Sequence, residues 1–357
     1  MDLFTPFECR GVTARNRIAV SPMCQYSCEA GDGLATDWHR VHLGSRAVGG
    51  AGIVMTEATA VTPRGRISPQ DLGIWSDDHA EALAPITEFL EKHGATSGIQ
   101  LAHAGRKGST RRPSEGGDPI HGDGGWTPVG PTAEPWPAET PAETERLDGA
   151  GIDRVTDAFV DAAVRAVDVG FDVLEIHAAH GYLLHEFLSP VTNAREDEYG
   201  GSFENRTRLL REVLKAIRAA VPEETPVFVR ISATDWLPDR DSWTVEDSAR
   251  LAGDLRPLGV DLVDVSAGGI HPDQRVPDTG AHYQVPYAER VAERGVPVGA
   301  VGKITTPTGA DEVIRNGRAD LAIVGREHLR DPYFAVHAAE ELGYDAPVPR
   351  QYTRGFD

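Results

Sequence analysis

The stretch Phe171-Asp-Val-Leu-Glu-Ile-His-Ala-Ala-His-Gly-Tyr182 joins a short, mostly apolar run to a group of polar side chains. Residues 171–176 have the length and the β-branched and apolar composition of a strand. His177, His180 and Tyr182 follow at its end. Two imidazoles and a phenol at one place supply hydrogen-bond donors and a proton source. Such a group suits polarising a carbonyl and protonating the adjacent carbon.

Runs of the same kind recur along the chain, and a helical pattern follows each of them. The eight predicted strands are 17–20, 52–57, 97–101, 171–176, 227–231, 262–265, 297–301 and 321–324. The predicted helices are 37–48, 78–93, 152–169, 203–220, 245–256, 287–293, 307–315 and 333–342, with Asp153, Thr244 and Thr306 as N-cap residues.

Eight strand–helix alternations predict an α/β fold, a (β/α)8 TIM barrel formed by residues 1–345 as a single domain. In such a barrel the carboxyl end of each strand carries the functional residues. The alternative is a doubly wound sheet, whose first strand should be followed by a Gly-x-Gly-x-x-Gly turn. No such turn follows Val20, which favours the barrel.

Two segments lack any helical period. Residues 103–150, rich in Gly, Pro and Thr, follow the third strand, and we predict a lid or small hairpin over the barrel mouth. Trp126 and Trp136 indicate that this insertion packs, against the alternative of a disordered surface loop. The tail, residues 346–357, carries Tyr352, Arg354 and Phe356.

Glycines gather at the ends of the last three predicted strands. Gly268 and Gly269 follow strand six, Gly302 follows strand seven, and Gly325 with Arg326 follows strand eight. Glycines let backbone N–H groups approach an anion, and an arginine adds charge. In TIM barrels this corner is the usual phosphate site, so we predict that these residues bind a phosphate.

Composition argues against several classes of function. The net charge of −20 is unsuited to binding nucleic acid. No apolar run approaches the roughly 20 residues of a membrane span, and no signal peptide is visible. The three cysteines, Cys9, Cys24 and Cys28, are too few for a disulfide framework. We therefore expect a cytoplasmic protein without metal, nucleic-acid or membrane partners.

Several motifs resemble the Old Yellow Enzyme family of FMN-dependent ene-reductases, and its small thermophilic-like bacterial branch is the most similar. The resemblance covers nearly the whole chain. The motifs are Ser21-Pro-Met-Cys24 with Tyr26, Thr56-Glu-Ala-Thr59, Gln100-Leu-Ala-His103, His177-Ala-Ala-His-Gly-Tyr-Leu-Leu-His-Glu-Phe-Leu-Ser-Pro190, Asn193-Ala-Arg195 with Tyr199-Gly-Gly-Ser202 and Glu204-Asn-Arg206, and Gly325-Arg326 with Asp331-Pro332.

The resemblance implies a barrel that binds FMN. It places on the flavin Ser21, Pro22, Met23, Cys24, Ala58, Gln100, Arg230, Gly325 and Arg326. Gln100 can donate and accept hydrogen bonds, as the flavin pyrimidine edge demands. Arg230 is permanently cationic and would stabilise charge on the reduced ring. Cys24 would tune the redox potential; the alternative for this residue is a buried, inert thiol.

The resemblance also implies a reaction. NADPH or NADH reduces the flavin, and flavin N5 then passes hydride to the β-carbon of an α,β-unsaturated carbonyl or nitro compound. His177 and His180, with Tyr26, hold the substrate oxygen, and Tyr182 protonates the α-carbon. The tail resembles one in which an arginine, here Arg354, reaches the substrate site of a neighbouring subunit, which implies a homodimer or homotetramer.

Other functions stay open at this point. One is a related FMN barrel reductase that acts on nitro or nitrate-ester xenobiotics, and another is a flavin-binding protein without catalysis. A metal-dependent hydrolase barrel would use His177 and His180 as ligands, with Glu57 or His103 in support. Larger iron–sulfur flavoenzymes need a four-cysteine cluster and a further dinucleotide-binding domain, which this chain lacks.

Overall fold

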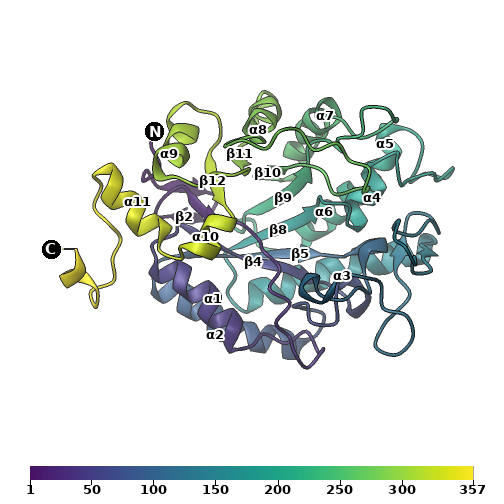
Figure 1. Cartoon of the computed structure of the whole chain (residues 1–357), viewed down its shortest axis with the longest axis horizontal. Helices are drawn as coiled ribbons and strands as arrows, with labels where there is room; N and C mark the ends of the chain where they lie inside the picture. The colour runs from purple at the N-terminus through teal and green to yellow at the C-terminus, as the bar shows by residue number, and fades with distance from the viewer. Residues whose placement is uncertain (357) are drawn as a thin grey trace.

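The computed structural model describes residues 1–356 and contains a closed barrel of eight parallel strands (Figure 1). The strands, in their order around the barrel, are β3 Ile18–Val20, β4 Ile53–Ala60, β5 Thr96–Ala102, β8 Val173–Ala178, β9 Val227–Ser232, β10 Leu262–Ser266, β11 Val298–Ala300 and β12 Leu321–Val324. Every predicted strand is present, and the predicted (β/α)8 TIM barrel is confirmed.

Helices cover the outside of the barrel (Figure 1). The long ones are α1 Asp37–Val48, α2 Asp77–Lys92, α3 Gly149–Asp168, α6 Arg208–Ala220, α7 Val245–Leu255, α8 Val285–Ala292, α9 Pro307–Arg315 and α11 Phe334–Leu342. Shorter helices lie in the connecting loops: α4 Leu183–Leu188, α5 Phe203–Arg206, α10 Arg326–Arg330 and the 3-10 turns Pro63–Gly65, Gly105–Lys107, Pro113–Glu115, Arg256–Leu258 and Thr353–Gly355.

Two of the three predicted N-caps are confirmed. The side chains of Thr244 and Thr306 accept hydrogen bonds from backbone N–H groups in the first turns of α7 and α9. The prediction for Asp153 is wrong, because α3 begins earlier, at Gly149. Its cap is Asp148, whose side chain accepts from the N–H of Gly151 at 2.7 Å. Asp153 instead lies within the helix.

The floor of the barrel is apolar and is closed by a hairpin that the sequence patterns did not predict. Strands β1 Phe7–Cys9 and β2 Val12–Ala14 pair antiparallel, and Phe7 meets Phe228 of β9 at a ring-centroid distance of 6.5 Å. Inward-facing apolar side chains surround this contact: Ala19, Ile53, Met55, Val173, Leu262, Leu321 and Ile323. Their burial stabilises the end of the barrel that lies opposite the functional loops.

The insertion at residues 103–150 packs against the barrel. Nε1 of Trp126 donates to the carbonyl of Arg64 at 3.1 Å, and the ring of Trp136 lies under the Lys107 ammonium. Its two short strands, β6 Val129–Gly130 and β7 Glu145–Arg146, pair in parallel. Residues 109–111 and 118–120 of the insertion also pair antiparallel, since the N–H of Arg111 donates to the carbonyl of Asp118 at 2.8 Å and the N–H of Ile120 to the carbonyl of Ser109 at 2.8 Å. The predicted packed insertion after the third barrel strand is therefore present.

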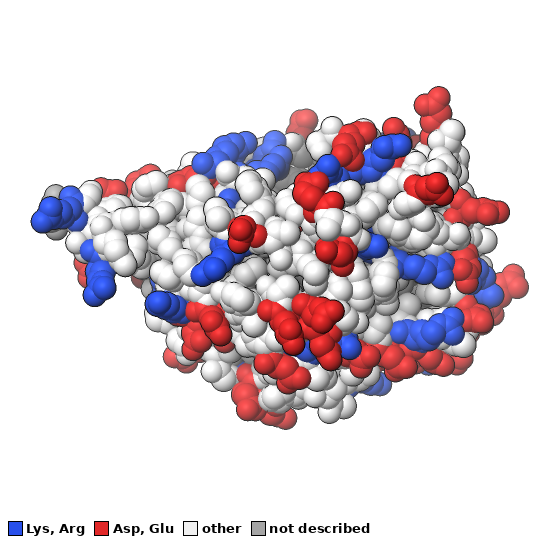
Figure 2. Space-filling view, turned by 90° about the horizontal axis from the view of Figure 1, so that it is seen from below, with Lys and Arg blue, Asp and Glu red and all other residues white. Residues whose placement is uncertain are grey.

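The carboxyl-terminal tail leaves the barrel after α11 and projects at one end of the molecule (Figure 1). Figure 2 shows basic side chains at this end, while acidic side chains spread along the lower edge of the same face. Tyr352 in the tail lies near Tyr333, with a ring-centroid distance of 6.2 Å. In the described part of the chain, no helix combines the length and apolarity that crossing a membrane requires.

Candidate active site

Three side chains from the end of β8 meet in one place. His177 belongs to β8 itself, and His180 and Tyr182 lie in the loop that leads into α4. The ring of His177 meets the ring of His180 edge to face at 5.2 Å, and the ring of Tyr182 at 5.1 Å. The structure therefore brings together the three residues that were predicted to bind and protonate a substrate.

Both imidazoles are neutral near pH 7. Burial, and after it the charge of Arg230, holds the pKa of His177 and of His180 well below the usual range. Nδ1 of His177 accepts a hydrogen bond from the backbone N–H of Ala179 at 3.3 Å, so the ring hydrogen is on Nε2. Nε2 of His180 lies 2.7 Å from Oγ of Ser266. His177 can thus donate from Nε2, while Ser266 engages one nitrogen of His180.

The phenol of Tyr182 keeps its proton at neutral pH. Burial raises the pKa of Tyr182 well above its usual value, and the nearby Cys24 and Tyr26 add to the effect. Nζ of Lys107 lies 4.9 Å from the centroid of the Tyr182 ring and 4.6 Å from that of Trp136. A protonated phenol at this position can supply a proton to a bound molecule.

The loop after β3 places Cys24 and Tyr26 near Tyr182. The backbone N–H of Gln25 donates to Oε1 of Glu57 at 3.0 Å, which ties this loop to β4. Burial raises the pKa of Glu57 to about 8, and it raises the pKa values of the Cys24 thiol and the Tyr26 phenol. Cys24 therefore stays a thiol rather than a thiolate.

Above the apolar floor, the barrel interior holds a layer of polar side chains. Nε2 of Gln100 on β5 donates to Oε1 of Glu175 on β8 at 2.7 Å. Nε of Arg230 on β9 lies 3.1 Å from Oδ2 of Asp264 on β10, and its Nη1 donates to Oγ of Ser21 at 3.3 Å. Desolvation raises the pKa values of Glu175 and Asp264, and Arg230 opposes this shift. The layer thus places an amide and a guanidinium in the barrel interior as donors.

The ends of β10, β11 and β12 surround a cavity of about 230 Å³. Ser266, Gly302, Lys303, Gly325 and Arg326 are among the residues that line it. Gly302 has a φ of 123°, which favours glycine, and a Cβ at Gly325 would come no closer than 3.6 Å to any neighbouring atom. The cavity is therefore open at Gly325 and carries cationic side chains, as the predicted phosphate site requires.

A second cavity, of about 350 Å³, lies between the loop after β3 and the 103–150 insertion. Tyr26, Lys107 and Trp136 line it, and Ala58 and Tyr182 share the wall of a small neighbouring cavity. Of the predicted substrate residues, Tyr26 lines this second cavity, which is separate from the cationic corner, whereas His177 and His180 line neither of the two. Such a space could admit a small organic molecule.

Not every predicted residue reaches these cavities. Gly268 and Gly269 lie in the loop after β10 and have positive φ values, but they do not line the cationic cavity. Arg354 is exposed on the 3-10 turn Thr353–Gly355, at the projecting end of the tail. Within one chain, the structure does not bring Arg354 to the histidines and Tyr182.

Three further cations near the site, Arg106, Lys107 and Lys303, have structural partners. Nη2 of Arg106 donates to the carbonyl of Ile270 at 3.1 Å, and Nζ of Lys303 donates to Oγ1 of Thr279 at 2.8 Å. Nζ of Lys107 donates to the carbonyls of His180 and Gly269. All three cations therefore fix the conformation of loops, and Lys107 and Lys303 also line a cavity.

Sequence reasoning missed the carboxyl partners of the site. Asp264 and Glu175 were part of predicted strands but received no role. A signal was available, because each is a charged residue inside an otherwise apolar strand, in the alternate register that faces inward. Asp235, which contacts His185, follows β9 in an irregular loop and carried no such signal.

The donors and the open corner fit FMN. Gln100 and Arg230 offer an amide and a cation at the barrel centre, and Arg326 lines a phosphate-sized cavity at its edge. A TIM barrel with this arrangement is the architecture of a flavin-dependent oxidoreductase.

The comparisons with known proteins agree. The chain belongs to the NADH:flavin oxidoreductase / NADH oxidase family, whose profile matches residues 2–345. It is 48% identical over 355 residues to NADPH dehydrogenase from Geobacillus thermodenitrificans, covering 99% of this chain and 98% of the relative. It is 44% identical over 356 residues to NADPH dehydrogenase from Bacillus subtilis, covering 99% of each.

Solved structures give the same fold. Morphinone reductase in complex with tetrahydroNAD is similar with a TM-score of 0.77 at 26% identity, over 99% of this chain and 94% of that one. The old yellow enzyme homologue from Zymomonas mobilis has a TM-score of 0.76 at 26% identity, over 97% and 94%. The chain spans about half of 2-naphthoyl-CoA reductase, which it matches over 52% of that protein with a TM-score of 0.85.

The predicted family is therefore confirmed, and the protein is an FMN-dependent flavin oxidoreductase of the Old Yellow Enzyme type. This class contradicts two alternatives raised by the sequence, the metal-dependent hydrolase and the flavin-binding protein without catalysis.

Proposed function

We propose that this enzyme is an ene-reductase, which reduces the activated C=C bond of an α,β-unsaturated carbonyl or nitro compound. The observation that carries the proposal is the meeting of His177, His180 and Tyr182 as neutral, protonated groups, next to Lys107, which contacts the Tyr182 ring and lines an open cavity. The neutral imidazoles can donate hydrogen bonds to an oxygen, and the protonated phenol can donate a proton to carbon. None of the three must first change its protonation state.

FMN would be held by the polar layer and the cationic corner. Gln100 and Arg230 face the pyrimidine edge, and Arg326 with the glycine loops binds the phosphate. Further flavin contacts come from Ser21, Pro22, Met23, Cys24, Ala58, Gly302 and Gly325, with Gly268 and Gly269 in the next loop. Bound FMN would supply the two-electron redox chemistry that connects oxidation of the reduced nicotinamide to reduction of the substrate C=C bond.

The imidazoles act on the substrate oxygen. Nε2–H of His177 donates to the carbonyl or nitro oxygen, and the negative charge that develops there strengthens the hydrogen bond. His180 adds a second contact, with Ser266 engaging its Nε2, and Tyr26 lines the cavity next to Lys107. Because both rings are neutral, they stabilise the developing charge as donors and keep their own protons.

Tyr182 completes the reaction by protonating the α-carbon. Its proton is retained by a raised pKa until carbanion character develops at that carbon. The phenolate left after the transfer lies beside the Lys107 ammonium and regains a proton from solvent.

NADPH is the proposed electron donor, since the relatives at 44–48% identity bear the name NADPH dehydrogenase. NADH is the alternative, and parallel reduction rates with the two donors decide between them.

The test separates the two halves of the reaction. The FMN-loaded enzyme is reduced by NADPH without oxygen and then mixed with 2-cyclohexenone, a nitroalkene or a nitrate ester. Rapid reoxidation of the flavin, with cyclohexanone as product, supports the proposal. Reoxidation by the nitrate ester alone would overturn it in favour of a xenobiotic nitrate-ester reductase.

We further propose that the protein assembles at least as a dimer, with Arg354 reaching the substrate site of a neighbour. Trp38 and Val41 of α1 are exposed apolar side chains, as are Tyr352 and Phe356 in the tail. Nε1 of Trp38 bonds to Oε1 of Gln25, the residue next to Tyr26. A tail that packs on α1 of a second copy would therefore lie beside the substrate cavity.

A further inference from the structure

The turn that carries two of the site residues has an unfavourable backbone. His180 has a φ of 58° and Gly181 a φ of 74°. A Cβ at Gly181 would lie 2.1 Å from the carbonyl oxygen of Gly269, so the turn is pressed against the loop after β10. A left-handed conformation at a non-glycine residue persists only where the surroundings hold it. The contacts that hold this turn therefore decide where His180 and Tyr182 point.

Contacts on both sides fix the backbone of His180. Its N–H donates to Oγ of Ser232 at 2.9 Å, and its carbonyl accepts from Nζ of Lys107 at 2.8 Å. Ser232 in turn donates to the carbonyl of Gly268 at 2.7 Å. These bonds tie the turn to β9 and to the loop after β10.

The next residue depends on a histidine that the proposed mechanism does not use. The N–H of Gly181 donates to Nδ1 of His185, one turn into α4, at 2.9 Å. An imidazole nitrogen that accepts a hydrogen bond carries no hydrogen. The ring hydrogen of His185 must therefore be on Nε2. If it were on Nδ1, two hydrogen-bond donors, Nδ1–H and the N–H of Gly181, would face each other and the bond would be lost.

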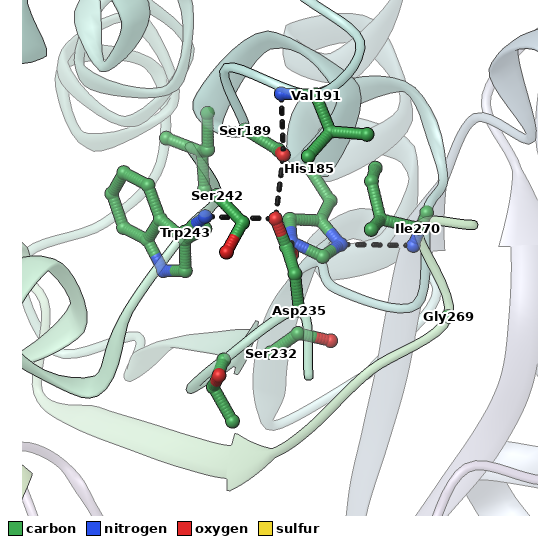
Figure 3. A network of polar contacts seen from close by, with 12 residues as sticks. His185, Ser189, Val191, Ser232, Asp235, Ser242, Trp243, Gly269 and Ile270 are labelled. Atoms are coloured by element: carbon green, nitrogen blue, oxygen red, sulfur yellow. Dashed lines mark hydrogen bonds and ion pairs between the residues drawn. The ribbon is translucent and has the colours of Figure 1, made fainter. Parts of the chain in front are cut away.

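A buried carboxyl lies where it can select this tautomer. Oδ1 of Asp235 lies 3.0 Å from Nε2 of His185, and both side chains are fully buried. The angle of this contact falls outside hydrogen-bond geometry. Neither atom has another hydrogen-bond partner among the described residues. The other oxygen, Oδ2, accepts from Oγ of Ser189 at 2.6 Å and from the N–H of Trp243 at 2.8 Å (Figure 3).

We propose that Asp235 and His185 are positioning residues, with Asp235 holding the hydrogen on Nε2 of His185 so that Nδ1 fixes the strained turn carrying His180 and Tyr182. A carboxylate that sets the tautomer and orientation of a histidine is a recurring arrangement in enzymes. The effect on substrate reduction rests on the proposed function, whereas the tautomer does not.

The first variant is Asp235→Asn. Ser189 and Trp243 are donors, so the amide oxygen takes the place of Oδ2 and the NH₂ group faces His185. A donor at that point favours the opposite tautomer, which breaks the bond to Gly181. We expect reoxidation of the reduced enzyme by 2-cyclohexenone to slow by about tenfold to a hundredfold, the scale of a small misplacement of catalytic groups. FMN affinity should stay within about threefold, because no flavin contact changes.

The second variant, His185→Asn, has a carbonyl oxygen in the place of Nδ1 and no tautomer to lose. In that background Asp235→Asn should change the reoxidation rate by less than about twofold. Such non-additivity is the expected result for two residues that act through one hydrogen bond. An equal loss in both backgrounds would overturn the proposal, because Asp235 would then act independently of His185.

A direct readout is the ¹⁵N NMR spectrum of the histidine-labelled, oxidised holoenzyme, with the His185 signals assigned by their loss in His185→Asn. We expect hydrogen on Nε2 in the parent protein and on Nδ1 in Asp235→Asn. Hydrogen on Nδ1 in the parent would refute the proposal. No substrate is present, so this result stands even if the proposed ene-reductase activity fails.

A matched control is Trp243→Phe, which shrinks a buried ring and removes the indole N–H bond to Oγ of Ser248, but keeps the backbone N–H that bonds to Asp235. It should lower thermal stability and leave the His185 tautomer and the reoxidation rate unchanged. A control that slowed reoxidation as much as Asp235→Asn would show that any destabilisation of this region suffices, and would contradict the proposal.

Discussion

The rings of His177 and Tyr182 meet edge to face, with centroids 5.1 Å apart and planes inclined by 75°. The imidazole and the phenol therefore approach one side of the same small space. In the proposed mechanism, a substrate whose oxygen binds His177 would have its neighbouring carbon near Tyr182. Binding would therefore position that carbon for protonation.

Replacing the phenol should affect only one half-reaction. We expect Tyr182→Phe to slow reoxidation of the reduced enzyme by 2-cyclohexenone by about 10²- to 10⁴-fold, the usual range for a general acid. Flavin reduction by NADPH should be unchanged, because it needs no proton from Tyr182. Stopped-flow absorbance measures both rates, and equal slowing of the two would exclude the role of Tyr182 as proton donor.

Removing the oxygen-binding imidazole should weaken ligand binding. We expect His177→Ala to bind p-hydroxybenzaldehyde about tenfold or more weakly, since a hydrogen bond to a charged oxygen contributes about 1.5–3 kcal/mol. The long-wavelength absorbance of the complex reports the affinity. His337→Ala, at an exposed position on α11, is the control. Unchanged affinity in His177→Ala would remove His177 from the substrate site.

The barrel interior should be sensitive to the loss of one carboxyl. Asp264→Asn removes the counter-charge of Arg230, and an unpaired buried charge costs about 3–5 kcal/mol. Urea unfolding of the apoprotein should show this loss. Glu175→Gln, in the same layer, keeps the acceptor for Gln100 and should cost less. A smaller effect for Asp264→Asn than for Glu175→Gln would contradict the pairing.

Glu57 should make a contribution to stability that falls as the pH rises from about 4.5 to 8. Burial raises its pKa from 4.5 to about 8, so the folded protein keeps a proton that the unfolded chain releases above pH 4.5. The stabilisation is complete below pH 4.5 and is lost by pH 8. Each proton contributes about 1.4 kcal/mol per pH unit. Glu57→Gln should lose this contribution, so the difference in unfolding free energy between parent and variant should change between pH 4.5 and 8, and a constant difference would disprove a raised pKa.

The tail should affect substrate binding only in the assembled protein. We expect light scattering to show a dimer or tetramer, and Arg354→Ala to raise KM for the enone while the oligomeric state is kept. Arg350→Ala, in the same exposed tail, is the matched control. A fully active monomer would exclude an intersubunit role.

The strands were predictable because each barrel strand is buried on both faces and therefore appears as a compact β-branched run. The strand-end residues His177, His180 and Tyr182 followed from the same pattern, since polar side chains at the carboxyl end of a barrel strand are rarely structural. The β1–β2 hairpin was not predicted, because three-residue strands are too short to show an alternation of apolar and polar residues.

Pairings across long sequence separations were not predictable. Asp235 lies 50 positions from His185, and Gln100 lies 75 positions from Glu175. Side chains this far apart meet only through the closure of the barrel, which sequence periodicity does not encode.

The position of Lys107 has a consequence for protein engineering. Its ammonium lies beside the Trp136 ring of the insertion and also bonds to the backbone of His180 and Gly269. A chimaera that exchanged residues 103–150 with those of a relative would replace Lys107 together with Trp136, and thereby remove the bonds that hold the loop carrying the imidazole and the phenol. Swapping the insertion to alter substrate range therefore requires the incoming segment to supply a lysine and an aromatic ring at these two places.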